Sequence, residues 1–105
     1  MLVQINTDSN IEGTEALAQQ AETVVMSALE HFTEHITRVE VHLSDENSDE
    51  KVGTDAKRCV LEARLAGRQP IAVSHQAATL EQAIDGAARK MRHSLSTVMG
   101  RLGNR

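Results

Sequence analysis

The chain of 105 residues contains no Trp or Tyr, and Phe32 is its one aromatic residue. Cys59 and Pro70 are likewise the one cysteine and the one proline. A protein with so few rings cannot stack splayed nucleic-acid bases on aromatic platforms. A lone cysteine cannot form an internal disulfide, which agrees with a reducing compartment. These absences predict an aliphatic, alanine-rich core and a cytoplasmic protein.

Long apolar segments are absent as well. No part of the sequence approaches the ~18 consecutive apolar residues of a membrane span. Residues 1–4 lack the basic region and following apolar segment of a signal peptide. A length near ~100 residues is typical of one domain. We expect a single domain over residues 1–105, with no membrane partner.

Cations are scarce in the first half of the chain. Residues 1–55 carry twelve Asp or Glu against Arg38 and Lys51, a formal charge of −10. Residues 56–105 carry nine Lys or Arg against three Asp or Glu, a charge of +6, and the whole chain is at −4. Such a split predicts that one surface can meet an anion while another repels it.

The apolar periodicity predicts four strands and two helices in the order strand, helix, three strands, helix. Period-two alternation places the strands at about residues 2–6, 38–43, 58–65 and 71–75. Apolar residues at spacings of three and four predict a first helix over about residues 15–34. A second helix is predicted from Thr79, which forms a capping box with Gln82.

These elements predict an α+β fold. Each helix has one apolar stripe and the strands have one apolar face, so both helices are expected on one face of a four-stranded sheet. The acidic segment 44–55 is expected to be a loop between two antiparallel strands. The opposite sheet face is expected to be solvated and of mixed charge, presenting Arg38, Glu40, His42, Arg58, Glu62 and Arg64.

Candidate catalytic residues are weak. Cys59 alternates with apolar residues, so we interpret it as a buried hydrophobe rather than a nucleophile. Ser74 and His75 are adjacent in a predicted strand but lack the glycine-flanked turn of a serine nucleophile. An enzyme would also need a concave polar pocket, which this aliphatic pattern gives no reason to expect. We predict no catalytic residue, no cofactor and no small-molecule substrate.

Metal ligands are equally sparse. His31 and His35 are spaced four residues apart, but no third ligand is placed to complete a site. Asp45, Asn47 and Asp49 match the first ligand positions of a calcium-binding loop. The match then fails, because Glu50 replaces the required glycine and the twelfth position is alanine. We predict no metal site.

The second helix has a different character, because no acidic residue follows Asp85 and the cations Arg89, Lys90, Arg92 and Arg101 accompany His93. Cations near a helix C-terminus also arise simply because the helix dipole favours them. On charge alone, that interpretation and an RNA-contacting face are about equally supported. Without aromatic platforms, any RNA recognition must use phosphates, 2′-hydroxyls and shape.

The sequence resembles the short form of the ribosome hibernation-promoting factor and ribosome-associated inhibitor family, also called ribosomal subunit interface proteins. The resemblance covers nearly the whole chain. The segments that carry it are Val41-His42-Leu43-Ser44-Asp45-Glu46-Asn47, Lys57-Arg58-Cys59, Glu62-Ala63-Arg64-Leu65 with Gly67-Arg68, and Leu80 with Ala83-Ile84-Asp85.

The resemblance implies a β-α-β-β-β-α fold similar to a double-stranded RNA-binding domain. It further implies a protein that sits in the mRNA and tRNA channel of the small ribosomal subunit and silences translation under stress or in stationary phase. Family members place basic side chains of both helices against ribosomal RNA. The matching positions of the second helix are Lys90 and Arg101, with His93 where the family often has Arg.

The first helix departs from this family pattern. Ala18, Val24, Ser27 and Glu30 stand where cations would be expected. Binding to a polyanion weakens as fewer phosphates are neutralised, so this departure predicts a lower affinity and a flatter salt dependence.

We therefore predict a non-catalytic factor that binds the small ribosomal subunit and its RNA, with no DNA partner. The predicted RNA-binding residues are Arg89, Lys90, Arg92, His93 and Arg101, helped by Lys57, Arg58, Arg64 and Arg68. The alternative is a protein-interaction module in which the acidic loop 44–55 and the first helix dock a basic protein partner. A small enzyme ranks third.

Overall fold

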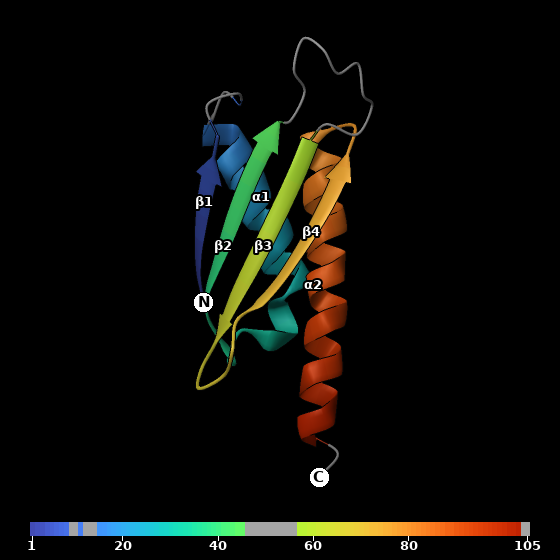
Figure 1. Ribbon diagram of the computed structural model, residues 1–105. Coiled ribbons are helices and arrows are strands. Elements are labelled where there is room, and N and C mark those ends of the chain that lie inside the picture. Colours follow the sequence, from blue (N-terminus) through green and yellow to red (C-terminus); the bar gives the residue numbers. More distant parts are fainter. Residues whose placement is uncertain (9–10, 12–14, 46–56, 104–105) are drawn as a thin grey trace.

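The computed structural model describes residues 1–8, 11, 15–45 and 57–103, apart from the side chains of residues 101–103. Its element order is strand, helix, three strands, helix (Figure 1). The elements are β1 (Leu2–Thr7), α1 (Glu15–Ala28), a 3₁₀ turn η1 (Glu30–Phe32), β2 (Ile36–Asp45), β3 (Lys57–Leu65), β4 (Ile71–Ala77) and α2 (Leu80–Gly103).

The four strands form one sheet in the order β1-β2-β3-β4. β1 runs parallel to β2 because α1 carries the chain back between them, and the other two pairings are antiparallel. The register places Ile5 opposite Val41 and Leu61 opposite Val73, so the apolar residues of successive strands share one face. No described helix is both long and apolar enough to cross a membrane.

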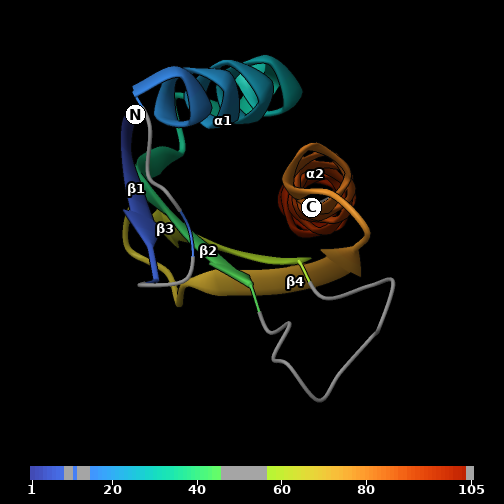
Figure 2. The same cartoon turned by 90° about the horizontal axis from the view of Figure 1, so that it is seen from above.

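Both helices cover the same face of the sheet (Figure 2). The predicted α+β arrangement is therefore confirmed. The core between the helices and the sheet is aliphatic, and its largest fully buried side chains are Leu29, Leu43, Leu61, Ile84, Met91, Leu95, Val25, Val39, Val41 and Cys59. Burying each large aliphatic side chain contributes about 1.5–3 kcal/mol, which offsets the ordering entropy of the chain.

The first helix is shorter than its apolar stripe predicted. α1 ends at Ala28 rather than near residue 34, and η1 follows it. The stripe continues to Phe32 because the 3₁₀ turn keeps that side chain packed against the core. The chain must leave the helix there, since Ile36 is 3% exposed and already belongs to β2. The spacing of apolar residues could not distinguish one more helical turn from this tighter one.

The strands extend further than the apolar alternation indicated. β2 continues through Ser44 and Asp45, which pair with Arg58 and Lys57 of β3. Backbone ladder bonds do not require apolar side chains, so the pairing persists where the sequence turns polar. The predicted acidic loop falls mostly on residues 46–56, which lie outside the described residues.

The start of α2 agrees with the predicted cap. Thr79 Oγ1 accepts a hydrogen bond of 3.1 Å from the backbone N–H of Gln82, and the Thr79 carbonyl accepts one from Ala83. These bonds satisfy donors that a helix N-terminus otherwise leaves free. The 24 residues of α2 span about 36 Å at 1.5 Å per residue, so its last turns extend past the end of the sheet (Figure 1).

Candidate nucleic-acid interface

The solvent-facing side of α2 carries the densest group of cations in the described structure. Arg89, Lys90, Arg92 and His93 are all exposed, whereas Ala88, which precedes them, and Met91, which lies among them, are buried. Helical periodicity produces this separation, because positions three or four apart share a face. We call the four exposed residues the α2 cationic flank.

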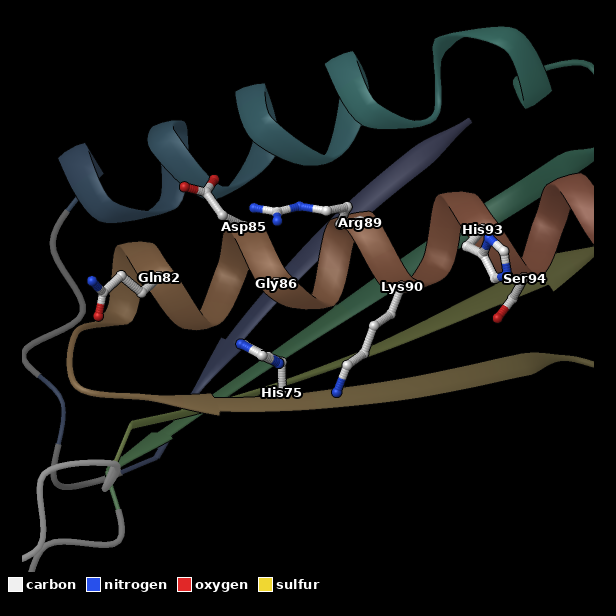
Figure 3. Close-up of a pocket in the computed structure, with 8 residues that line it drawn as sticks. All are labelled: His75, Gln82, Asp85, Gly86, Arg89, Lys90, His93 and Ser94. Atoms are coloured by element: carbon white, nitrogen blue, oxygen red, sulfur yellow. The ribbon is translucent and has the colours of Figure 1, made fainter.

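A cavity of about 740 Å³ lies between this flank and β4. Figure 3 shows His75 of β4 and Lys90 of α2 directed into the same space, while Asp85 and Arg89 lie on the rim nearer α1. Its lining residues are His75, Gln82, Asp85, Gly86, Arg89, Lys90, His93 and Ser94. The aliphatic pattern of the sequence does not predict this hollow. Only the pairing of β4 with β3 and the packing of α2 above them create it.

The Nζ of Lys90 is fixed at the lip of this cavity. It donates a hydrogen bond of 2.8 Å to the backbone carbonyl of Ser74 in β4. A second, smaller hollow of about 360 Å³ opens on the other side of that contact, lined by Arg58, Ser74, His75, Gln76 and Lys90. His75 and Lys90 therefore line both hollows.

A groove of about 420 Å³ runs between the two helices. Arg89 and Arg92 line its α2 side, and Thr23, Val24 and Ser27 line its α1 side. The α1 side contributes no cation, as the departure of the first helix from the family pattern predicted.

The exposed surface of α1 and of the η1 turn that follows it is instead acidic. Glu15 and Glu22 of α1 and Glu30 of η1 are exposed. Gln20 Nε2 joins the two helices by donating a 2.9 Å hydrogen bond to Oε1 of Glu81. The helical face of the molecule is therefore divided, with carboxylates along α1 and cations along the middle of α2.

The predicted cations of the strands lie apart from the α2 flank and differ in their surroundings. Lys57 Nζ pairs with the carboxylate of Asp45 at one end of the β2–β3 ladder. Arg64 lies on the outer sheet face, 3.4 Å from Glu40 and 3.1 Å from Glu62. Each of these two cations is partly neutralised where it stands.

The remaining predicted residues take three different positions. Arg58 lines the smaller hollow beside Lys90. Arg68 is exposed in the turn between β3 and β4 and lines a separate cavity with Val98 of α2. Arg101 belongs to the last turn of α2, and its side chain lies outside the described part of the chain. Lys90 and His93 thus lie toward β4, with Arg58 near Lys90, whereas Arg92 lies toward α1 and Arg89 lines the hollows on both sides of α2.

The outer face of the sheet has the mixed charge that the alternation predicted. Arg38 Nη2 donates to Glu40 at 3.2 Å and also to the side-chain oxygen of Gln4. With Arg64 and Glu62 this forms a self-neutralised network. Exposed pairs of this kind contribute about 0–1 kcal/mol each, so the network shapes the surface charge more than the stability.

Sequence reasoning missed the contact between His75 and Gly86. His75 faces the helices because it pairs with Cys59, a buried residue of β3. A Cβ placed on Gly86 would overlap Cδ2 and Nε2 of the His75 ring. The detectable signal was an isolated glycine inside a strong helical pattern, which often marks a close approach.

Cys59 is completely buried, and burial raises the pKa of its thiol to about 12, because a thiolate there would lose its hydration. It therefore lacks the thiolate character of a nucleophile. Within the described ranges, no three His, Cys, Asp or Glu side chains are grouped so that they could hold a metal ion.

Fold and surface together define an α+β protein whose second helix presents a cationic flank beside an open sheet edge. The chain belongs to the family described as sigma 54 modulation protein / S30EA ribosomal protein, whose profile matches residues 3–102. It is thus a member of a family of ribosome-associated proteins, and the resemblance inferred from the sequence is confirmed.

Two solved structures share the fold. A ribosomal subunit interface protein from Coxiella burnetii is 14% identical, with a TM-score of 0.77 over 95% of this chain and 99% of that one. The N-terminal domain of Protein Y from Thermus thermophilus is 20% identical, with a TM-score of 0.73 over 93% of this chain and 99% of that one. Among curated protein sequences none matches this chain.

Proposed function

We propose that this chain is a non-catalytic cytoplasmic factor that binds the RNA of the small ribosomal subunit and inhibits translation under stress or in stationary phase. Residues 1–105 act as one ribosome-binding domain in this proposal. Membership of a ribosome-associated family supports it. The observation that carries it is the α2 cationic flank, where Arg89, Lys90, Arg92 and His93 are exposed together.

The α2 cationic flank is suited to bind RNA without recognising its base sequence. The described surface offers guanidinium and ammonium groups that contact phosphates, whereas Phe32, the one Phe, Tyr or Trp ring of the sequence, packs against the core. Such a protein reads the backbone and the shape of folded RNA. Recognition of this kind depends strongly on salt, because each neutralised phosphate releases bound counterions.

The α2 cations carry more of the contact than Lys57 and Arg64. Those two are already held by Asp45 and by Glu40 with Glu62. A phosphate that engaged them would have to compete with the carboxylates. Arg58 and Arg68 remain auxiliary contacts at the margins of the flank.

Matched double substitutions test this division of roles. The variant Arg89→Gln/Arg92→Gln removes two cations from the flank, and Lys57→Gln/Arg64→Gln removes two cations that carboxylates hold. Co-sedimentation with small ribosomal subunits is measured over a series of salt concentrations. We expect the first variant to bind at least about tenfold more weakly than the wild type. Its slope of log affinity against log salt concentration should be shallower by up to about 1.5. The second variant should stay close to the wild type. Wild-type binding by the first variant would contradict the proposal.

Inhibition of translation needs its own assay. Wild-type protein should lower the yield of cell-free translation, and the Arg89→Gln/Arg92→Gln variant should require a higher concentration for the same effect. The Lys57→Gln/Arg64→Gln variant is again the control. A variant that loses subunit binding but inhibits fully would show that inhibition has another origin.

Nuclease treatment separates this proposal from docking of a basic protein by the acidic half. Capture from a lysate with and without nuclease should lose the ribosomal partner in the treated sample. A basic protein partner held by α1 and the acidic segment would remain.

A further inference from the structure

The two hollows beside β4 have the lining of an anion site. The larger is about 740 Å³, within the range of small-ligand pockets, and the smaller adjoins it at Lys90. Around them stand the cations Arg58, Arg89 and Lys90, with Asp85 as the one carboxylate in either lining. Ser74, Gln76, Gln82 and Ser94 supply neutral polar groups.

Lys90 occupies the boundary between the hollows. Its Nζ is held 2.8 Å from the Ser74 carbonyl, which uses one of the three N–H groups of an ammonium. The other two remain for ligands on either side. A fixed ammonium between adjoining hollows suits two neighbouring phosphate groups better than one isolated anion.

His75 reaches the site because residue 86 is glycine. Glycine within a helix costs about 0.5–1 kcal/mol relative to alanine, yet here it leaves room for an imidazole against the backbone of α2. The ring lines both hollows, and His93 lines the larger one. Gly86 therefore lowers helix stability at the point where the imidazole of His75 lies near Lys90.

The charges around His75 determine how it responds to a ligand. From α2 it is approached by Lys90 and His93, while Asp85 and Arg89 lie on the rim nearer α1 (Figure 3). Its pairing partner in β3 is Cys59, a buried neutral thiol, and the neighbouring Arg58 alternates to the other face of the sheet. A bound anion beside the ring favours its protonated form, because opposite charges attract. Binding of an anion should therefore take up a proton.

We propose that the two hollows bind a diphosphate group, with Lys90 between the phosphates and protonated His75 as a further donor, so that affinity increases as the pH falls. The ligand is a free diphosphate, such as that of a nucleoside diphosphate, whose two phosphorus atoms share a bridging oxygen. This inference goes beyond the proposed function, because it concerns the isolated chain and does not require a ribosome. The only rings of this lining are the imidazoles of His75 and His93, and we expect the phosphates rather than the base to carry most of the recognition.

Calorimetric titration of the purified chain with pyrophosphate and with ADP tests the site directly. We expect binding about fivefold to tenfold tighter at about pH 6 than at about pH 8, because histidine changes charge in that interval. Binding enthalpies in two buffers of different ionisation heat should reveal proton uptake. Absence of binding by both pyrophosphate and ADP at about pH 6 would overturn the proposal.

Matched histidine variants assign the effect to a residue. His75→Ala should remove most of the pH dependence and the proton uptake. His42→Ala is the control, since His42 is exposed on the outer sheet face between Asn6 and Val60. Lys90→Gln should weaken binding at both pH values. Circular dichroism confirms that each variant is folded, and Gly86→Ala supplies a second way to displace the His75 ring. Equal pH dependence in the His75→Ala and His42→Ala variants would contradict the site.

The source of the phosphates follows from the same titrations. Binding of pyrophosphate and ADP that depends on His75 supports the site with a free nucleotide as ligand. Binding of an RNA duplex without binding of pyrophosphate or ADP would contradict the diphosphate site and leave only the RNA contact of the proposed function. Failure of the ribosome experiments would leave the pyrophosphate result unchanged, so the two proposals fail separately.

Discussion

Cys59 illustrates how one side chain couples burial to chemistry. It lies in the middle of β3 with no solvent exposure, and burial raises the pKa of its thiol from 9.0 to about 12. Unfolding restores ordinary hydration and lets the thiol ionise. The folded protein therefore holds a proton at alkaline pH that the unfolded chain releases.

The first prediction concerns stability in alkaline solution. Between about pH 9 and 12, the Cys59 thiol should lower the free energy of unfolding by up to about 1.4 kcal/mol for each unit of increasing pH. Urea denaturation of the wild type and of Cys59→Ala, measured at several pH values, isolates this slope. Lys and Arg titrate in both proteins and cancel in the difference. Parallel pH profiles for the two proteins would contradict the prediction.

Gly86 and His75 give the second residue-scale prediction. Gly86→Ala should destabilise the fold, although alanine is the better helix former, because the new methyl group overlaps the imidazole. In a His75→Ala background the same change should stabilise the fold by about 0.5–1 kcal/mol. Thermal or urea denaturation of the four proteins of this cycle provides the measurement.

Gly100 is the matched control for that cycle. It also lies in α2, but a Cβ placed there meets nothing within 4 Å. Gly100→Ala should be neutral or stabilising in both backgrounds. If Gly86→Ala has the same sign with and without His75, the close contact does not constrain the helix.

At the scale of the element, α2 depends on its first turn. Its N-terminus is capped by Thr79, and its core stripe runs through Ile84, Ala88, Met91 and Leu95. The cationic flank and the core stripe are two faces of the same helix, so its rotation fixes both. A change at the cap should therefore affect stability without moving the flank.

Thr79→Ala should lower the free energy of unfolding by about 1 kcal/mol, because the hydroxyl no longer accepts the N–H of Gln82. Thr97→Ala is the control. The Thr97 hydroxyl donates to the His93 carbonyl four residues earlier, a bond that contributes little to helix stability. Chemical denaturation compares the two variants. Equal losses at Thr79 and Thr97 would show that the cap has no special role.

At the scale of the whole molecule, the charge split of the sequence becomes a division within one face. The two helices lie side by side on the sheet (Figure 2), with exposed carboxylates on α1 and cations on α2. A polyanion that approaches the α2 flank therefore has an acidic neighbour across the groove. That neighbour limits affinity and orients the partner.

A cation introduced on α1 should therefore raise affinity for the small subunit. Ser27 is exposed and lines the groove opposite Arg92. Ser27→Lys should tighten binding severalfold and steepen the salt slope by up to about 0.9. Ala72→Lys adds the same charge on β4 at the outer sheet face, where little change is expected. Co-sedimentation with small subunits at two salt concentrations compares the affinities of the two variants. An equal gain in affinity from both would show that only net charge matters.

Sequence pattern alone established the element order, the α+β class and the shared apolar face. It succeeded because periods of 2 and about 3.6 follow directly from strand and helix geometry. It also placed the α2 cations on one flank, since a helix of known rotation fixes the direction of each side chain. The pattern could not predict where α1 ends, because an apolar residue such as Phe32 fits either an α-helical or a 3₁₀ turn.

Tertiary structure alone decided which cations are neutralised and where a cavity opens. Lys57 and Arg64 resemble Arg89 and Arg92 in the sequence, but their surroundings are set by strand register, which places Asp45, Glu40 and Glu62 beside them. His75 and Gly86 belong to separate predicted elements, a strand and a helix. Their contact exists because α2 packs across β4. The isolated glycine in the helical pattern indicates a close approach, but the order of residues does not reveal which side chain makes it.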